Sequence, residues 1–414
     1  MSIEETLTYR KAAGVLVRLS STTAKDMSTL APLFDSDAGS RGAMLMAASS
    51  SRGKRKNSPE PQMLVFAKLG IAYGAVTQEG LEAMRRHPAV AAVKEANSLR
   101  MIRPVPYLAA AEPSKPGPGP TWGVRAIKAD AMWAQGLSGA GVLVAHLDTG
   151  IDGAHPMLEA AIERAAVFDL GGQERKASTP PTDSDEHGTH TAGTIAGRPY
   201  KKVQAGVAPG AKLLTAEVIE GGDSIARVLA AMNWALLNGA RVLNLSLGWP
   251  TYTDSFLMIL DALRANECLP VIASGNEGEG ATRSPGNYAQ ALSVGAVSEA
   301  GQVPLFSGSE IMKRDVDSIV PDIVAPGDGI WSAAVGGGFK VMRGTSMATP
   351  HISGLAALLL EAEPKATVSQ LEQAVFASAA RSKKVVETRA GRGLPDGVKA
   401  LQILQDLVST GAAA

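Results

Sequence analysis

An alternation of short apolar runs with longer segments of helical periodicity restricts the fold of this chain most. Apolar runs at 142–147, 213–218, 242–247, 269–273 and 291–297 predict strands, and residues 224–238 and 255–266 predict helices. Short runs without polar alternation are typical of parallel strands covered by helices on both faces. We therefore expect an α/β fold with a mainly parallel central sheet between two helical layers.

A smaller unit precedes this alternation. Strands are predicted at 14–19, 63–69 and 89–93 and a helix at 77–86, which together indicate an α+β domain over residues 1–104. Residues 105–120 are rich in proline and predict an extended linker, so the second domain spans 121–414. The basic run Arg52 to Lys56 lies in a long polar insertion and is interpreted as a solvated loop, with a targeting or binding patch as the alternative.

Three polar residues stand where the predicted elements begin or end. Asp148 closes the apolar run 142–147, His187 lies at the start of a small-residue helical segment, and Ser346 lies in Gly-Thr-Ser-Met-Ala before an apolar helix. Free N–H groups and the positive dipole end of that helix favour negative charge beside the hydroxyl of Ser346. A lone Thr-Ser here would be an ordinary helix cap, so the other two residues decide the interpretation.

Taken together, these three blocks and a fourth at 271–278, which contains Asn276, resemble the subtilisin-like serine proteases. The resemblance extends from about residue 121 to 407 and implies that family's three-layer fold and a serine endopeptidase that forms an acyl-enzyme intermediate. It implies that Ser346 is the nucleophile, His187 the general base, Asp148 the residue that orients the base and Asn276 an oxyanion donor.

The resemblance also indicates where a substrate would bind. Ser246, Leu247 and Gly248 are expected to pair with an extended peptide, and Gly221 and Gly222 are expected to form the opposite edge. Ser274 and Gly275 lie in the same block as Asn276 and complete the predicted substrate contacts. Arg283 falls near the expected floor of the specificity pocket, so the side-chain preference stays open.

The N-terminal segment is similar to the family's inhibitor-like propeptide. This similarity implies a self-processed zymogen whose own N-terminal domain is a folding aid and inhibitor, cut between Asn97 and Glu112, near Met101 or Ile102. Two alternatives stay open at this stage: an inert protease fold that binds peptides or serves as a scaffold, and a serine hydrolase acting on esters. The block around Ser346 lacks the Gly-x-Ser-x-Gly pattern expected of α/β-hydrolases.

The amino-acid composition limits the kinds of partner and the cellular compartment that we expect for this chain. Forty basic and forty acidic side chains cancel, which gives no argument for binding nucleic acid or a membrane. The start of the chain is too acidic and its first apolar run too short for a secretory signal, so we expect a cytoplasmic protein. Cys268 is the single cysteine, which excludes an intramolecular disulfide, and its apolar surroundings predict a buried thiol.

No cofactor is expected. The tight calcium site of the family requires a carboxylate where this chain has Met157, and the companion loop carries Arg198, Lys201 and Lys202 where oxygen ligands are needed. A metal site of His190 with Asp185 is a minor alternative, because the resemblance implies a structural histidine at 190. His155 and His351 are expected to pack or hydrogen-bond, and the sequence assigns no role to His146.

Overall fold

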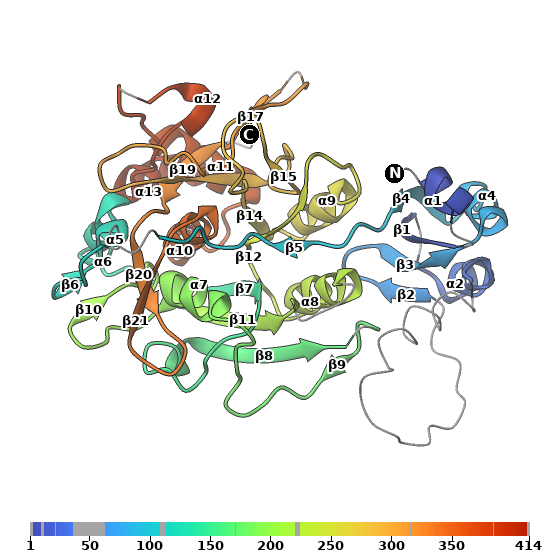
Figure 1. Cartoon of the computed structure of the whole chain (residues 1–414), viewed down its shortest axis with the longest axis horizontal. Coiled ribbons are helices and arrows are strands. Elements are labelled where there is room, and N and C mark those ends of the chain that lie inside the picture. Colours follow the sequence, from blue (N-terminus) through green and yellow to red (C-terminus); the bar gives the residue numbers. More distant parts are fainter. Residues whose placement is uncertain are drawn as a thin grey trace.

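The computed structural model contains a large α/β body and a smaller α+β body (Figure 1). It describes residues 3–9, 12–20, 22–35, 63–107, 113–169, 171–219, 224–314, 316–383 and 385–411. The basic run at 52–56 and the predicted substrate edge at Gly221 and Gly222 lie outside these residues. Among the described helices, none is long and apolar enough to cross a membrane.

The large body is organised around an eight-stranded sheet with the order β19-β16-β14-β12-β7-β11-β8-β9. Its strands are β7 (Leu143–Asp148), β8 (Ile162–Phe168), β9 (Glu174–Arg175), β11 (Lys212–Glu217), β12 (Val242–Leu245), β14 (Leu269–Ala273), β16 (Leu292–Val297) and β19 (Ile323–Pro326). Every pair in it is parallel except β8 with β9, which is antiparallel. The predicted mainly parallel sheet is therefore confirmed.

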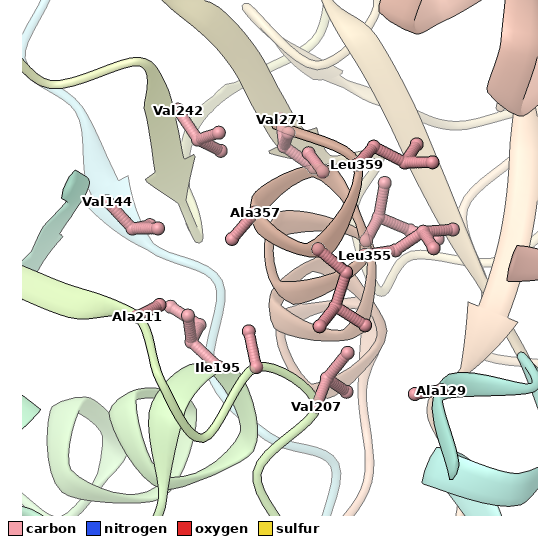
Figure 2. Close-up of a cluster of buried hydrophobic side chains, with 14 of the residues drawn as sticks. Ala129, Val144, Ile195, Val207, Ala211, Val242, Val271, Leu355, Ala357 and Leu359 are labelled. Carbon is pink, nitrogen blue, oxygen red and sulfur yellow. The ribbon is translucent and has the colours of Figure 1, made fainter. Parts of the chain in front are cut away.

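Side chains of this sheet alternate between two separate cores. Val144 and Val271 pack in one core against Leu355 of the long helix α10 (Thr345–Ala362), as Figure 2 shows. The next residue of each strand, Ala145 and Ile272, belongs to the core on the opposite face. Each fully buried leucine contributes about 1.5–3 kcal/mol of hydrophobic stabilisation. The sheet is thus packed against apolar side chains on both faces.

Helices form the two outer layers. The face with α10 is completed by α5 (Trp122–Ala126), α6 (Ala129–Trp133), α7 (His187–Ala196), α11 (Val368–Ser378) and α13 (Gly397–Ser409), and the other face by α8 (Ile225–Leu237) and α9 (Leu257–Ala265). Shorter elements are η2 (Glu159–Ala161), α12 (Glu387–Ala390), β5 (Arg100–Met101), β6 (Gly119–Pro120), β10 (Val203–Gln204), β13 (Leu247–Pro250), β15 (Arg283–Ser284), β17 (Glu310–Ile311), β18 (Ile319–Val320), β20 (Ile330–Ala333) and β21 (Phe339–Met342).

An antiparallel sheet of order β2-β3-β1-β4 makes up the small body. Its elements are α1 (Ile3–Tyr9), β1 (Ala13–Leu19), α2 (Ala24–Leu30), η1 (Ala31–Leu33), β2 (Met63–Phe66), β3 (Ile71–Val76), α4 (Gln78–Arg85) and β4 (Val90–Glu95). The single strand predicted at 63–69 was wrong in its extent. It ends at Phe66, and a turn whose last residue is Gly70, at φ +62°, leads into β3, which the sequence did not predict.

The small body packs on helices α8 and α9. Phe66, Leu69 and Ile71 belong to the same core as the side chains of those helices. The backbone N–H of Lys68 donates to Asn233 Oδ1 over 2.9 Å, and Asn266 Nδ2 donates to the Lys68 carbonyl over 3.1 Å. Residues 96–107 then leave the small body and run across the large one (Figure 1).

Candidate active site

The three candidate catalytic residues lie at the ends of elements from different parts of the sequence. Asp148 is the last residue of β7, His187 the first of α7 and Ser346 the second of α10. All three side chains are fully buried. The carboxyl end of β7 thus meets the N-terminus of α7, and α7 packs against α10, the helix that carries Ser346.

Asp148 and His187 form a tight hydrogen-bonded pair. His187 Nδ1 donates to Asp148 Oδ1 over 2.6 Å, and the Thr149 N–H donates to the same oxygen over 2.8 Å. Burial disfavours the charged form of both groups, but the attraction and hydrogen bond between them have the larger combined effect. The pKa of His187 is therefore raised above 6.5, and the pKa of Asp148 is lowered. The ring therefore keeps its proton on Nδ1 and presents Nε2 as a base.

Ser346 is engaged by a segment of the chain itself. Its Oγ donates to the carbonyl oxygen of Ile102 over 2.7 Å. His187 Nε2 is buried and has no hydrogen-bond partner among the described residues. The structure therefore places a peptide carbonyl, rather than the histidine, against the candidate nucleophile.

Asn276 is held with its amide nitrogen toward the same segment. Its Oδ1 accepts from the backbone N–H and the hydroxyl of Thr345, each over 2.9 Å, and this fixes the orientation of the amide. Nδ2 then donates to the carbonyl of Arg103 over 2.8 Å, one residue beyond Ile102. The sequence analysis missed the part played by Thr345, although its place directly before Ser346 was a signal for it.

The predicted substrate edge at 246–248 pairs with this segment. Met101 and Arg100 in β5 lie antiparallel to Leu247 and Gly248 in β13, and the Ile102 N–H donates to the Ser246 carbonyl over 3.0 Å. Segment 100–102 is therefore bound as an added β-strand, with Ile102 at the candidate nucleophile.

Ser246 also binds the backbone of Ser346, and a proline in α10 makes this possible. Pro350 lies inside α10 and has no N–H, so the Ser346 carbonyl four residues earlier lacks its helical partner. The Ser246 hydroxyl donates to this carbonyl over 3.4 Å. On the other side of the segment, where Gly221 and Gly222 were predicted, the described residue Ser224 donates its hydroxyl to the Leu99 carbonyl over 2.7 Å.

Arg283 and Ile102 line the same surface pocket. Its guanidinium pairs with Glu277, with Nε 2.8 Å from Oε1. A side chain added at Gly248 would meet Arg283 at 2.7 Å, so this arginine closes the space next to the substrate edge. Gly275, at φ +122°, leads the chain into Asn276, whereas the buried hydroxyl of Ser274 donates to the Gly308 carbonyl over 2.9 Å and so ties the loop to the body.

His146, to which the sequence assigned no role, lies behind the carboxylate. Its Nδ1 is 3.0 Å from the Thr215 hydroxyl and its Nε2 is 2.9 Å from the Thr191 hydroxyl, which lies 3.1 Å from Asp148 Oδ2. Burial lowers its pKa, so the ring is neutral. The negative charge of Asp148, 3.8 Å from Nε2, favours the tautomer with the proton on Nε2. In that tautomer, Thr191 accepts from His146 and can donate to the carboxylate.

The buried histidines His155, His190 and His351 each hydrogen-bond to a backbone carbonyl. His190 Nε2 donates to the Ile330 carbonyl over 2.9 Å, and burial lowers its pKa to about 3. Asp185 instead accepts from the N–H groups of Glu186 and His187. In the described parts of the chain, no three His, Cys, Asp or Glu side chains are grouped so that they could hold a metal. The thiol of Cys268 is buried, which raises its pKa to about 12.

In the region that the family resemblance assigns to a calcium ion, backbone carbonyls accept hydrogen bonds from an arginine side chain. Met157 is fully buried. The guanidinium of Arg198 donates to the backbone carbonyls of residues 160, 196 and 211 over 3.1–3.2 Å. Oxygen atoms in this region thus already bind a cationic side chain, which disfavours a second cation.

Comparison with known proteins agrees with this geometry. The Subtilase family matches residues 139–395. The chain is 32% identical to subtilisin E of Bacillus subtilis (strain 168) over 323 residues, which cover 76% of each chain. It is 35% identical to a subtilisin of Bacillus pumilus over 266 residues, covering 62% of this chain and 90% of that protein. An alkaline protease of Alkalihalobacillus alcalophilus is 34% identical over 305 residues, covering 72% of this chain and 71% of that protein.

The matched residues include all four candidate blocks and every strand of the central sheet. Similarity therefore extends over the same part of the chain that carries the buried Asp148 and His187 pair and Ser346. The chain belongs to the subtilase family and is a subtilisin-like serine endopeptidase, a hydrolase that acts on peptide substrates.

Proposed function

We propose that the first substrate of this endopeptidase is its own peptide bond between Ile102 and Arg103. One observation carries the proposal: the hydroxyl of Ser346 lies 2.7 Å from the Ile102 carbonyl oxygen, in a segment bound as a β-strand. The nitrogen of this bond belongs to Arg103 and leaves as an amine, which can accept a proton from His187. The position agrees with the cut expected near Met101 or Ile102.

In the proposed reaction, His187 Nε2 removes the hydroxyl proton while Ser346 Oγ forms a bond to the Ile102 carbonyl carbon. The carbonyl oxygen becomes an oxyanion, for which the Asn276 amide and the Ser346 N–H are the candidate donors. The carbon–nitrogen bond then breaks, and His187 gives its proton to the Arg103 nitrogen. Water, deprotonated by His187, hydrolyses the acyl-enzyme and frees the Ile102 carboxylate and Ser346. Asp148 remains ionised and stabilises the imidazolium.

The N-terminal body is proposed to act as folding aid and inhibitor. Phe66, Leu69 and Ile71 share a core with α8 and α9, so residues up to 102 have a docking surface that does not depend on the cleaved bond. Pairing of Arg100 and Met101 with β13 keeps the product end in the cleft. The boundaries 1–104, 105–120 and 121–414 remain predictions, and self-cleavage at Ile102 would place the first boundary two residues earlier.

The test is self-processing of the full-length chain. Wild-type protein should yield a fragment ending at Ile102 and a catalytic fragment beginning at Arg103, identified by N-terminal sequencing and intact mass. Ser346→Ala should remain a single chain because it has no nucleophile, whereas Ser409→Ala, an exposed serine at the end of α13, should be processed normally.

Two results would refute the proposal. One is a wild-type chain that stays uncut while it hydrolyses casein, and the other is a Ser346→Ala chain that is cut at the same bond. Labelling by a serine-directed fluorophosphonate separates an active enzyme from an inert peptide-binding fold, because only an activated Ser346 reacts.

A further inference from the structure

The segment beyond the Ile102–Arg103 bond is also bound to the catalytic body. The Val105 N–H donates to the Arg343 carbonyl over 2.9 Å, and the Arg343 guanidinium donates to the Pro106 carbonyl over 2.5 Å. Arg343 lies between β21 and α10, three residues before Ser346. The leaving-group side of the cleft is thus formed by the same loop that carries the nucleophile.

Tyr107 ends this bound segment in a site of its own. Its hydroxyl donates to Asp328 Oδ1 over 3.1 Å and accepts from the Gly329 N–H over 2.7 Å. Its ring faces the Arg343 guanidinium at 4.5 Å, and the same guanidinium lies 5.9 Å from the Phe306 ring. The phenol of Tyr107 thus has a hydrogen-bond donor in the Gly329 N–H and an acceptor in Asp328, and the Arg343 guanidinium lies over the face of its ring.

The catalytic body holds this site in place without help from the N-terminal body. The indole N–H of Trp122 donates to the Gly329 carbonyl over 3.0 Å, which fixes the turn between β19 and β20. Trp122 packs with Ile330, Met342 and Met347, so the turn is attached to β20, β21 and the start of α10. The site therefore persists when residues 1–102 leave.

We propose that Arg343, Asp328 and Gly329 form a subsite that selects tyrosine five residues beyond the bond to be cleaved. The substrate class is a peptide with a phenol at that position. Phenylalanine would fill the same space but would leave the Gly329 N–H and the Asp328 carboxylate without their partner. The numbering of this subsite rests on the proposed cut between Ile102 and Arg103.

The test uses processed enzyme carrying Tyr107→Ala, so that its own tyrosine does not compete. Its substrates are three dodecapeptides with the sequence of residues 98–109 and tyrosine, phenylalanine or alanine at the position of Tyr107. We expect kcat/KM for tyrosine to exceed that for phenylalanine about fivefold, as one hydrogen-bonded hydroxyl provides. The peptide with alanine should have a still lower kcat/KM, because it also lacks the ring that contacts the Arg343 guanidinium.

Asp328→Ala, made in the same enzyme, should lower the ratio of tyrosine to phenylalanine, because the Gly329 N–H is then the one remaining partner of the hydroxyl in this subsite. Asp406→Ala, an exposed aspartate on α13, should leave the ratio unchanged. Because each ratio compares two peptides on one enzyme, a loss of folded protein cancels. Equal rates for tyrosine and phenylalanine, or a ratio that survives Asp328→Ala, would overturn the proposal.

A second measurement separates this subsite from the proposed cut. Heptapeptides with the sequence of residues 103–109, carrying tyrosine or phenylalanine, are used as inhibitors of casein hydrolysis. If the dodecapeptides are not cleaved after isoleucine but the tyrosine heptapeptide inhibits about fivefold better, the cleavage site is wrong and the tyrosine site stands. Equal inhibition by the two heptapeptides would refute the tyrosine site even where the cut is correct.

Discussion

Replacing Gly188 by alanine adds a single methyl group and should strongly lower kcat/KM. Gly188 is the second residue of α7, directly after His187, and a Cβ there would lie 2.1 Å from the carbonyl oxygen of Gly150, just beyond β7. Ordinary contact begins near 3.4 Å. Helix and strand end would therefore have to separate by about 1 Å, since interiors packed at crystal density offer no free space.

That displacement acts directly on the candidate base. The bond between His187 Nδ1 and Asp148 Oδ1 is only 2.6 Å long and joins the two elements that would separate. A misplacement of about 1 Å in a catalytic group costs about 10²-fold in rate, and we expect kcat/KM to fall by this factor. Alanine is favoured over glycine in a helix by about 0.5–1 kcal/mol, but overpacking costs about 1–3 kcal/mol, so the protein should also be less stable.

The assay is kcat/KM per active site, with folded protein counted by thermal melting. Gly117→Ala is the neutral control, because Gly117 lies in the linker with nothing within 4 Å of an added Cβ. Gly397→Ala is the packing control, because its Cβ would meet the sulfur of Met132 at 2.7 Å, between α13 and α6, neither of which carries a candidate catalytic residue. It should lower the melting temperature but retain most activity. A Gly188→Ala enzyme within twofold of wild type would refute the proposed coupling of helix position to catalysis.

Three further outcomes are expected. As the pH falls, kcat/KM should reach half of its plateau value above pH 6.5, because the pKa of His187 is raised and the protonated ring cannot act as a base. A midpoint well below pH 6.5 would contradict the raised pKa. His146→Leu should lower kcat/KM about fivefold by removing the donor to Thr191, and His146→Gln should restore it; equal activity of both variants would show that His146 only fills space. Millimolar calcium in place of EDTA should leave the melting temperature unchanged, since Arg198 binds the loop carbonyls; a rise of many degrees would refute this.

Strands and helices of the large body could be predicted because its elements follow simple patterns. A strand buried on both faces must be apolar throughout, and Val144 and Ala145 show this, since they belong to different cores. In the small body the same reasoning failed at Gly70. Its positive φ turns the chain back at once, and nothing in the apolar run from 63 to 69 marks where the first strand ends.

The sequence patterns predicted which elements carry the candidate residues, and the family resemblance implied the pairing of Asp148 with His187 and a cut near Met101 or Ile102, but the individual contacts of Ser346 were not predicted. Asp148, His187 and Ser346 each lie at the end of a predicted element, and Asp148 meets His187 where the carboxyl end of β7 reaches the start of α7. The contact of Ser346 with Ile102 depends on the register of a segment more than 240 positions away in the sequence, which neither propensity nor spacing determines. Tyr107 escaped prediction for the same reason.

Cleavage at Ile102 and inhibition by the same segment are compatible, because the two sides of the bond are held by separate contacts. The upstream side is held by pairing with β13 and by the core that the small body shares with α8 and α9. The downstream side is held by Arg343 and by the hydrogen bonds of Tyr107. Hydrolysis breaks the connection between the two sides without removing the contacts of either, so both new ends start at high effective concentration beside their sites. Release then depends on how fast each set of contacts opens, and a peptide with its own tyrosine competes only for the downstream set. The proposed scheme therefore predicts an enzyme that cuts itself before it becomes free to cut other chains.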